Sequence, residues 1–294
     1  MKSISIQTAA EQGNGSQPAV IFLHIPKTAG TTLLRILDRQ YSPEVVHSFG
    51  ADAHKSVAEY KALDEESRKN IRLLRGHMAY GLHEYLPSSA GYFTILREPV
   101  ARVISYYNFI RRNPEHYLYD EVMGNDLSLH ALIESGLPLM MNDAQVRLLS
   151  GVWGDPGFGE VSLAMLETAQ QNLADSFIVV GLTEQFDKTL LLLKEKLNWQ
   201  HDISYQRLNV SKQGVKEDRL PKETIELIKR VNRQDIALYA YAQELFKKQC
   251  SQQGFFFKYR VRYFQYLNKY QLDMDIKKLR TYSVRVKLKS ILRM

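Results

Sequence analysis

An uninterrupted apolar run that leads directly into a polar loop and a helical pattern constrains the fold of this chain most strongly. Residues 19–24, Ala-Val-Ile-Phe-Leu-His, lack the polar alternation of a half-exposed strand and match a parallel strand that is covered on both faces. Across residues 30–39, Leu33, Leu34 and Leu37 recur at helical spacing. A strand, a tight loop and a helix together present the N–H groups of a helix N-terminus to an anion.

Further strands alternate with helical patterns along the chain. Strands are predicted at residues 71–74, 92–96 and 177–180. Pro99 suits the first turn of a helix, because its missing N–H costs nothing there, and this helix is predicted to reach about residue 112. The alternation predicts an α/β fold with a largely parallel sheet.

The positive charge of the chain is concentrated at its C-terminal end. The sequence of 294 residues has 39 Lys or Arg and 32 Asp or Glu, a net charge of +7. Residues 255–294 hold eleven of these bases and two of these acids, a net charge of +9, so the first 254 residues have a net charge of −2. The nearly neutral body argues against nucleic acid as a partner and implies that any anion is recognised by a few placed groups.

The C-terminal segment needs a separate explanation. Phe256, Tyr259, Tyr263, Tyr266 and Tyr270 recur every three or four residues and would form one aromatic face of a helix. Four interpretations stay open at this point: a helix packed on the body, contact with an anionic membrane, an oligomer contact, and a binding surface for an acidic acceptor.

The chain is predicted to have three parts. We expect a flexible leader over residues 1–18, one domain over residues 19–250 and a basic aromatic extension over residues 251–294, in which residues 284–289 alternate like a half-exposed strand. The single cysteine, Cys250, permits no internal disulfide and fits a reducing compartment. No apolar run approaches the roughly 20 residues that a membrane-spanning helix needs.

The loop after the first strand has the composition of a phosphate-binding loop. Lys27 supplies a positive charge, Gly30 permits close approach of the backbone, and threonine hydroxyls lie where a helix begins. The alternative is an ordinary connection with a threonine as the N-cap. A Walker A loop is disfavoured, because its lysine follows the second glycine whereas Lys27 precedes Gly30 by three positions. The candidate loop consists of Pro26, Lys27, Thr28, Ala29, Gly30, Thr31 and Thr32.

Two segments resemble, in the same order, the cofactor-binding motifs of one enzyme family. Residues 22–32, FLHIPKTAGTT, resemble the 5′-phosphosulfate loop of sulfotransferases that use 3′-phosphoadenosine-5′-phosphosulfate (PAPS), in the carbohydrate branch that includes heparan sulfate 2-O-sulfotransferase. Residues 96–107 resemble the 3′-phosphate motif of this family, which would place Arg97 and Ser105 at that phosphate. The resemblance extends over roughly residues 19–250.

This resemblance implies a P-loop-like three-layer sandwich with a central, mainly parallel sheet flanked by helices. It also implies PAPS as the donor, adenosine 3′,5′-bisphosphate (PAP) as the product, and a reaction that requires no metal. Lys27 would neutralise the charge that develops on the leaving nucleotide. Ser211, Lys212 and Gly214 are placed like the late loop that covers the adenosine in such enzymes, and an ordinary solvated loop is the alternative.

A histidine is the residue type best suited to remove the acceptor proton, because its ordinary pKa is near neutral. His77 follows the strand predicted at residues 71–74, at the strand end where open α/β sheets place ligands. The string from Gly76 through His77 also resembles the segment that holds the catalytic histidine of heparan sulfate 2-O-sulfotransferase. His77 is therefore the predicted base, with His24 and His83 as the other candidates.

The predicted function is sulfuryl transfer from PAPS to a hydroxyl of a carbohydrate or glycolipid. Two alternatives are retained: a P-loop-like small-molecule kinase, and a nucleotide- or membrane-binding module without transfer activity. Animal Golgi relatives carry an anchor and usually several cysteines, so the resemblance and the composition together predict a soluble, bacterial-type member. We expect it in the cytoplasm, with residues 255–294 making a peripheral contact with the inner membrane face or an oligomer contact.

Overall fold

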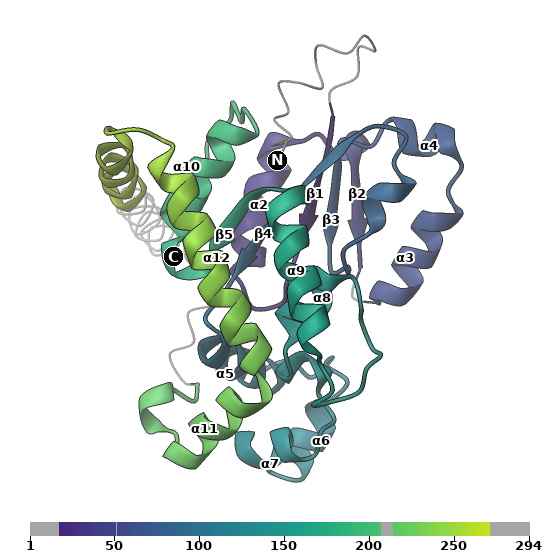
Figure 1. Cartoon of the computed structure of the whole chain (residues 1–294), viewed down its shortest axis with the longest axis vertical. Coiled ribbons are helices and arrows are strands. Elements are labelled where there is room, and N and C mark those ends of the chain that lie inside the picture. Colours follow the sequence, from purple (N-terminus) through teal and green to yellow (C-terminus); the bar gives the residue numbers. More distant parts are fainter. Residues whose placement is uncertain (1–17, 51, 207–213, 271–294) are drawn as a thin grey trace, which may run out of the picture.

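The first apolar run of the sequence forms the central strand of the sheet. The computed structural model describes residues 18–50, 52–206 and 214–270, and within them five strands form one sheet in the order β2-β3-β1-β4-β5 (Figure 1). Every neighbouring pair is parallel. The strands are β1 (Ala19–Leu23), β2 (Val46–Phe49), β3 (Leu73–Gly76), β4 (Ala90–Leu96) and β5 (Phe177–Leu182).

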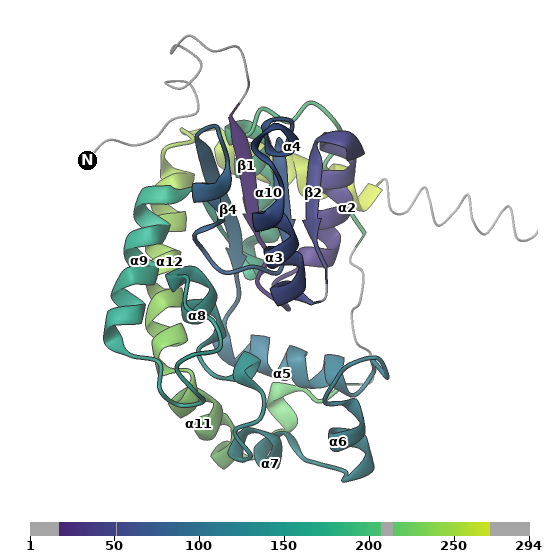
Figure 2. The same ribbon diagram turned by 90° about the vertical axis from the view of Figure 1, so that its right-hand side faces the viewer.

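Helices cover both faces of this sheet, so the predicted three-layer α/β sandwich with a central parallel sheet is confirmed. Figures 1 and 2 show α2 (Gly30–Gln40) and α10 (Phe186–Lys196) on one face. The other face is covered by α8 (Ala144–Ser150), α9 (Leu163–Ser176) and α12 (Arg233–Ser251). Two further helices, α3 (Ala53–Ala62) and α4 (Glu65–Lys69), lie beyond the β2 edge.

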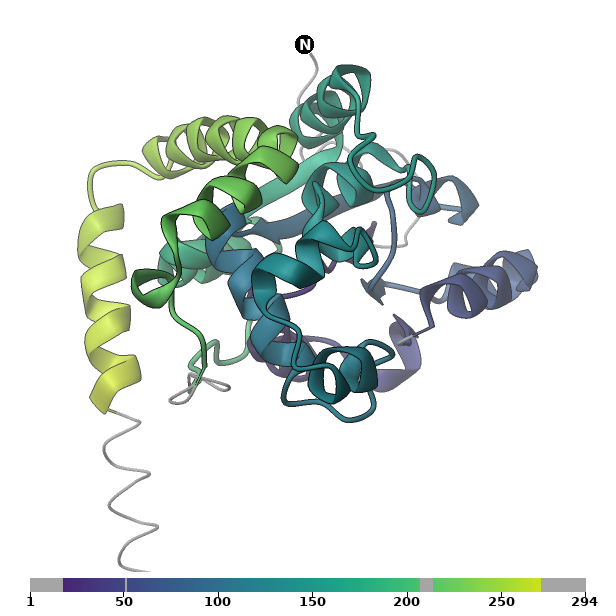
Figure 3. The ribbon, with the colours of Figure 1, turned by 90° about the horizontal axis from the view of Figure 1, so that it is seen from below.

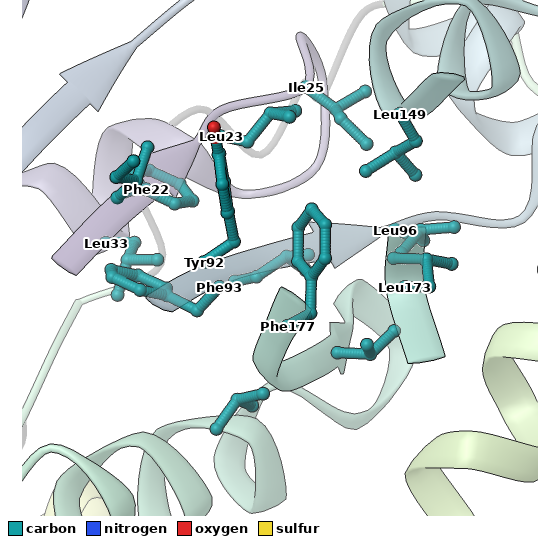
Figure 4. Close-up of a cluster of buried hydrophobic side chains, with 14 of the residues drawn as sticks. Phe22, Leu23, Ile25, Leu33, Tyr92, Phe93, Leu96, Leu149, Leu173 and Phe177 are labelled. Carbon is teal, nitrogen blue, oxygen red and sulfur yellow. The ribbon is translucent and has the colours of Figure 1, made fainter. Parts of the chain in front are cut away.

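Burial from both sides explains why β1 lacks polar alternation. All five of its residues are buried, and the ring of Phe22 stacks on Phe93 of β4 with 5.1 Å between centroids. Figure 4 shows Leu33 of α2 in this cluster, with Leu149 of α8 and Leu173 of α9 among the buried side chains. Both faces of the central strands are therefore apolar core.

The strand predicted at residues 71–74 lies two residues further along, at Leu73–Gly76. Arg75 can belong to this strand because its charge is paired: Nη1 lies 2.6 Å from Oδ1 of Asp38 on α2, and Nε donates to Ser48 of β2 at 3.0 Å. A prediction that follows apolar residues ends the strand before a charged residue, so it stopped at Leu74 although the strand continues through Arg75. The correction brings the strand directly up to His77.

A second hydrophobic cluster lies below the carboxyl ends of the strands. It is built mainly by residues of the helices α5 (Pro99–Ile110), α6 (Tyr119–Gly124), α7 (Leu129–Glu134) and α11 (Lys222–Val231). Figure 2 shows these helices beneath the sheet, with α5 lying nearest to it. The carboxyl ends of the strands thus face a helical floor instead of open solvent.

A buried polar junction ties the helices of this floor to those on the sheet. The carboxylate of Asp235 in α12 accepts hydrogen bonds from the N–H groups of Gln145 and Val146, which begin α8. In return, Oδ1 of Asp143 accepts from the N–H of Asp235 at 2.7 Å. Arg102 of α5 lies 3.7 Å from Asp235, and both side chains are fully buried. Each helix N-terminus is therefore capped by a carboxylate of the other helix.

This junction predicts an unusual pH dependence of stability. Burial, and then the nearby charge of Asp235, raise the pKa of Asp143 from 3.8 to about 7. Between these values the folded chain binds a proton that the unfolded chain releases, so stability falls as pH rises through this window. Asp143→Asn keeps the Oδ1 acceptor and tolerates the left-handed φ of 45°. We expect its Tm to exceed that of the wild type by about 2–4 °C above pH 7.

Thermal unfolding from pH 4 to pH 9 measures this difference, which should vanish near pH 4. Asp235→Ala is the variant for comparison. It removes both hydrogen bonds that Asp235 accepts at the start of α8 and leaves Arg102 buried without its carboxylate, which should lower the free energy of unfolding by about 3–5 kcal/mol. An Asp143→Asn protein that follows the wild-type pH profile would show that Asp143 is ionised throughout.

Candidate active site

Three of the predicted site segments follow three adjacent strands. His77 comes directly after β3, the loop of residues 24–29 after β1, and Arg97 directly after β4. These strands are neighbours in the order β3-β1-β4 and are parallel, so their carboxyl ends meet at one edge. This edge is where open α/β sheets bind ligands.

The loop has a backbone shape suited to an anion. Lys27 and Ala29 both have positive φ, at 73° and 68°, an uncommon conformation for residues other than glycine. The hydroxyl of Thr28 donates to the carbonyl of Ile25 at 2.8 Å and closes the turn. When residues in right-handed and left-handed backbone conformations follow one another, successive N–H groups point toward one concave side.

The N-terminus of α2 is not capped by a side chain. Ala29 occupies the N-cap position, and no side chain of the described residues accepts a hydrogen bond from the first turn. The alternative of an ordinary connection capped by a threonine is therefore wrong, since the hydroxyl of Thr28 is used inside the loop. The first turn of α2, which contains Thr31 and Thr32, therefore has N–H groups without a side-chain acceptor among the described residues, and such groups can bind an anion.

Two glycines are required by close packing at this edge. A Cβ at Gly30 would overlap the imidazole of His24, so the glycine lets this ring lie against the start of α2. Gly76 has a φ of 136°, and a Cβ there would lie 2.6 Å from the carbonyl oxygen of Phe49. The second glycine therefore sets the turn by which β3 delivers His77 to the loop.

His77 is held in one tautomer by the backbone. Its Nδ1 lies 2.9 Å from the carbonyl oxygen of His24, and its ring stacks on the His24 ring at 4.4 Å. A carbonyl can only accept, so Nδ1 carries the proton and Nε2 keeps its lone pair. In the part of the chain that is described, nothing donates to Nε2.

Burial is the main reason why the pKa of His77 is lowered, and the nearby charge of Lys27 acts in the same direction. The hydrogen bond to His24 opposes these two effects. The imidazole is therefore neutral near pH 7, in the protonation state that a general base needs.

The two other candidate histidines have different surroundings. The ring of His24 stacks between Phe22 and His77, and burial holds its pKa well below 6.5. Nδ1 of His83 lies 3.0 Å from the hydroxyl of Tyr92, which sits in the first half of β4, away from the carboxyl ends. No contact among the described residues joins His83 to Lys27.

The ammonium group of Lys27 lies over an aromatic ring of α5. Its Nζ lies 4.1 Å from the ring centroid of Phe109 on α5. Burial, then the charges of Arg112 and Arg97, lower its pKa from 10.5 to about 8. Ser105 lies one turn before Phe109 on the same face of α5, which brings the predicted serine to the side of the helix that faces the loop.

Arg97 is anchored from both sides. Its Nη1 donates to the carbonyl of Lys27 at 3.0 Å, which joins the end of β4 to the loop. The side-chain amide of Gln145 accepts from the Arg97 N–H and donates to the Arg97 carbonyl, both at 3.0 Å. Because Gln145 itself belongs to the junction with Asp235, the buried polar junction supports the site directly.

Sequence reasoning missed three residues of this environment. Phe109 and Arg112 follow Ser105 by four and seven residues, so helical spacing from the serine could have found them. Gln145 stands 48 residues after Arg97, on another helix, and no local pattern links the two.

The late loop is only partly described. Ser211 and Lys212 lie outside the described residues, as do residues 1–17 of the predicted leader and residues 284–289. Gly214 is half-buried and precedes Val215, whose backbone N–H and carbonyl both bond to the side chain of Asn108 on α5 at 2.8 Å. The predicted glycine thus lies beside the helix that carries Ser105.

The described ranges contain neither a candidate metal-binding cluster nor a helix suited to span a membrane. Between residues 18 and 270, leaving out 51 and 207–213, no group of three or more His, Cys, Asp or Glu residues could hold a metal ion. In the same ranges, no helix combines the length and the apolar character needed to cross a membrane.

The tautomer of His77 can be measured. We expect ¹⁵N NMR of the imidazole rings to show a neutral His77 with the proton on Nδ1 and a pKa below 6.5. His54, which is exposed on α3, serves as the internal reference. An Nε2–H tautomer, or a pKa above 6.5, would contradict the bond to the His24 carbonyl.

Comparisons with known proteins show the family to which the sequence is similar. A sequence model of the Sulfotransferase family matches residues 16–242. The chain is 27% identical over 202 residues to galactose-3-O-sulfotransferase 2 of Sus scrofa, which covers 62% of this chain and 49% of that protein. It is 26% identical over 275 residues to heparan-sulfate 6-O-sulfotransferase 1 of Homo sapiens, covering 78% of this chain and 66% of that protein. The chain therefore spans about half to two thirds of the length of these relatives.

Among solved structures, the mouse sulfotransferase SULT7A1 complexed with PAP superimposes with a TM-score of 0.42 and 13% identity, over 83% of this chain and 94% of that chain. The stretch matched by the family model is more than half of the sequence, and it contains Lys27, His77 and Arg97 together with all five strands of the sheet. The chain therefore belongs to the Sulfotransferase family.

Proposed function

We propose that this chain transfers a sulfuryl group from PAPS to a hydroxyl of a saccharide or glycolipid. One observation carries the proposal: a neutral histidine, whose Nε2 accepts no hydrogen bond from the described residues, lies near a helix N-terminus without a side-chain cap and a half-buried lysine. The first group can accept a proton, and the others can hold a phosphosulfate and stabilise charge on it.

The donor would be held by groups of this chain in two places. The N–H groups at the start of α2 and the ammonium of Lys27 would bind the 5′-phosphosulfate. Arg97 and Ser105 would bind the 3′-phosphate, since a guanidinium is a forked and permanently charged donor. The loop that contains Ser211, Lys212 and Gly214 would cover the adenosine. PAPS, when bound, supplies the activated sulfuryl group.

The reaction would be an in-line displacement. Nε2 of His77 accepts the proton of the acceptor hydroxyl while the oxygen forms a bond to sulfur, and the bond between sulfur and the phosphate oxygen breaks. The ammonium of Lys27 stabilises the negative charge that remains on that phosphate oxygen. The remaining groups orient donor and acceptor, and we propose that no metal is needed.

The acceptor class is proposed from the relatives, whose names refer to galactose and heparan sulfate. Membership in a 2-O-sulfotransferase-like branch and a bacterial, soluble type are also proposals, supported by the string from Gly76 to Tyr80 and by the single cysteine. The side chain of Tyr80 itself packs near Phe177, and its hydroxyl bonds to Ser176 at 2.7 Å. This tyrosine therefore packs at the start of β5, and no contact among the described residues joins it to Lys27.

The decisive experiment replaces the proposed base. His77→Asn keeps an N–H that can reach the His24 carbonyl and has no basic nitrogen. We expect transfer of labelled sulfate from PAPS to a panel of saccharides and glycolipids to fall about 10²–10⁴-fold, with PAP affinity unchanged. His83→Asn, at the Tyr92 hydroxyl, is the matched control and should retain activity.

Full transfer activity in His77→Asn would show that another group is the base. The kinase alternative predicts magnesium-dependent ATP turnover, and the binding-module alternative predicts PAP binding without transfer by the wild type. Product analysis of the labelled saccharide would identify the position that is sulfated.

The lowered pKa of Lys27 predicts a pH-dependent affinity for PAP. The anion favours the protonated lysine, so affinity should be constant well below pH 8 and should weaken as pH rises above 8, by up to about tenfold per unit. Lys27→Arg keeps the charge at all these pH values. Calorimetric titration with PAP on both sides of pH 8 should show the decline in the wild type and a flat profile in Lys27→Arg. A decline in both proteins would assign it to another group.

A further inference from the structure

The last described helical segment, residues 257–270, has a docked side and an outer side. Phe257 and Val261 are buried against the main core, and Phe264 packs on it from the same side. The segment follows α12 after a turn at Gly254, and Figure 3 shows it at the edge of the molecule. Its packed stripe is therefore not the aromatic stripe that the sequence spacing had singled out.

Three polar contacts fix how this helix is rotated about its own axis. They lie on the docked side or flank it, so the opposite side cannot turn inward without breaking them. The contacts are Arg260 with Glu195 at 2.9 Å, the Gln265 amide with Asp187 at 2.9 Å, and the Tyr205 N–H with Asn268 at 2.8 Å.

The outer side carries a row of exposed aromatic rings. Phe256 is 71% exposed, Tyr263 and Tyr266 are each 65% exposed, and Tyr259 and Tyr270 lie on the same stripe. Large apolar groups that gather on one fixed surface are uncommon in a protein that has no partner there.

A row of cations borders this aromatic stripe. At 100° per residue, Lys258, Arg262 and Lys269 fall on one flank of the helix, and all three are exposed. Nζ of Lys258 lies over the rings of Phe255 and Tyr259 at 4.8 and 5.0 Å. Residues 255–270 contain four bases and no acid, so the whole segment attracts anions.

We propose that this aromatic–basic face, the outer side of residues 255–270, binds the anionic surface of a lipid membrane. Tyrosine rings suit the headgroup layer, since the ring is apolar and the hydroxyl stays wet. Lysines and arginines beside them gain energy from anionic headgroups, as at the cytoplasmic leaflet of a membrane. A second copy of the chain fits less well, because a two-fold contact would oppose two surfaces that carry cations and no acids.

Vesicle co-sedimentation of the full chain tests this proposal. We expect binding to vesicles of phosphatidylcholine mixed with phosphatidylserine, little binding to phosphatidylcholine alone, and loss of binding at high salt. Replacing Lys258, Arg262 and Lys269 by Gln should lower the partition coefficient about a hundredfold. Replacing Tyr259, Tyr263 and Tyr266 by Ser should lower it about tenfold or more.

The matched control removes three exposed cations from other helices, in Lys222→Gln, Arg230→Gln and Lys248→Gln, and it should bind as the wild type does. The proposal would be overturned if the control lost as much vesicle binding as the variant that lacks Lys258, Arg262 and Lys269. It would also be overturned if that variant and the Tyr→Ser variant both bound vesicles as the wild type does. A different outcome would assign the face to a second copy of the chain: the wild type forms a dimer and does not bind vesicles, and the Tyr→Ser variant is a monomer. PAP affinity should be the same in all variants, so these outcomes are independent of the sulfuryl transfer proposed above.

Discussion

The parallel pairing of β1 with β3 on one side and with β4 on the other is the constraint on which the site depends. Parallel strands end at the same edge, so His77, 53 residues after His24, and Arg97, 70 residues after Lys27, both arrive beside the loop that follows β1. The pairing also fixes the chemistry there. His77 can use the carbonyl of His24 only because β3 and β1 end together, and Arg97 can reach the carbonyl of Lys27 only because β4 ends beside them.

The electrostatic character of this edge follows from burial. Lys27 and His77 are both half-buried, and their partial removal from water favours the neutral form of each and lowers both pKa values. The effects differ in consequence. The imidazole becomes neutral at physiological pH, whereas the ammonium remains largely charged with a pKa of about 8. Burial at this edge thus gives a neutral proton acceptor, His77, and a cation, Lys27, close to each other.

The support for the site comes from helices that are remote in sequence. Gln145 grips the backbone of Arg97, and its own N–H is bonded by Asp235 of α12, so the last helix of the domain positions the end of β4. The same helix leads, through the turn at Gly254, into residues 257–270. The groups proposed to bind the anion are therefore few and held by specific contacts, whereas the bases of residues 255–270 lie on a separate surface, in agreement with the uneven charge of the sequence.

The α/β class, the strand β1, the loop with Lys27 and the strand-end positions of His77 and Arg97 could be predicted from the sequence. Each depends on a local pattern: an apolar run, a glycine, or a turn after a strand. The prediction misplaced β3 by two residues, since the pairing partner of Arg75 lies on another helix. The tautomer of His77, the anchoring of Arg97 by Gln145 and the outward side of residues 257–270 became visible only in the folded chain. Those depend on contacts between residues far apart in the chain, and local periodicity carries no information about which of two faces will be covered.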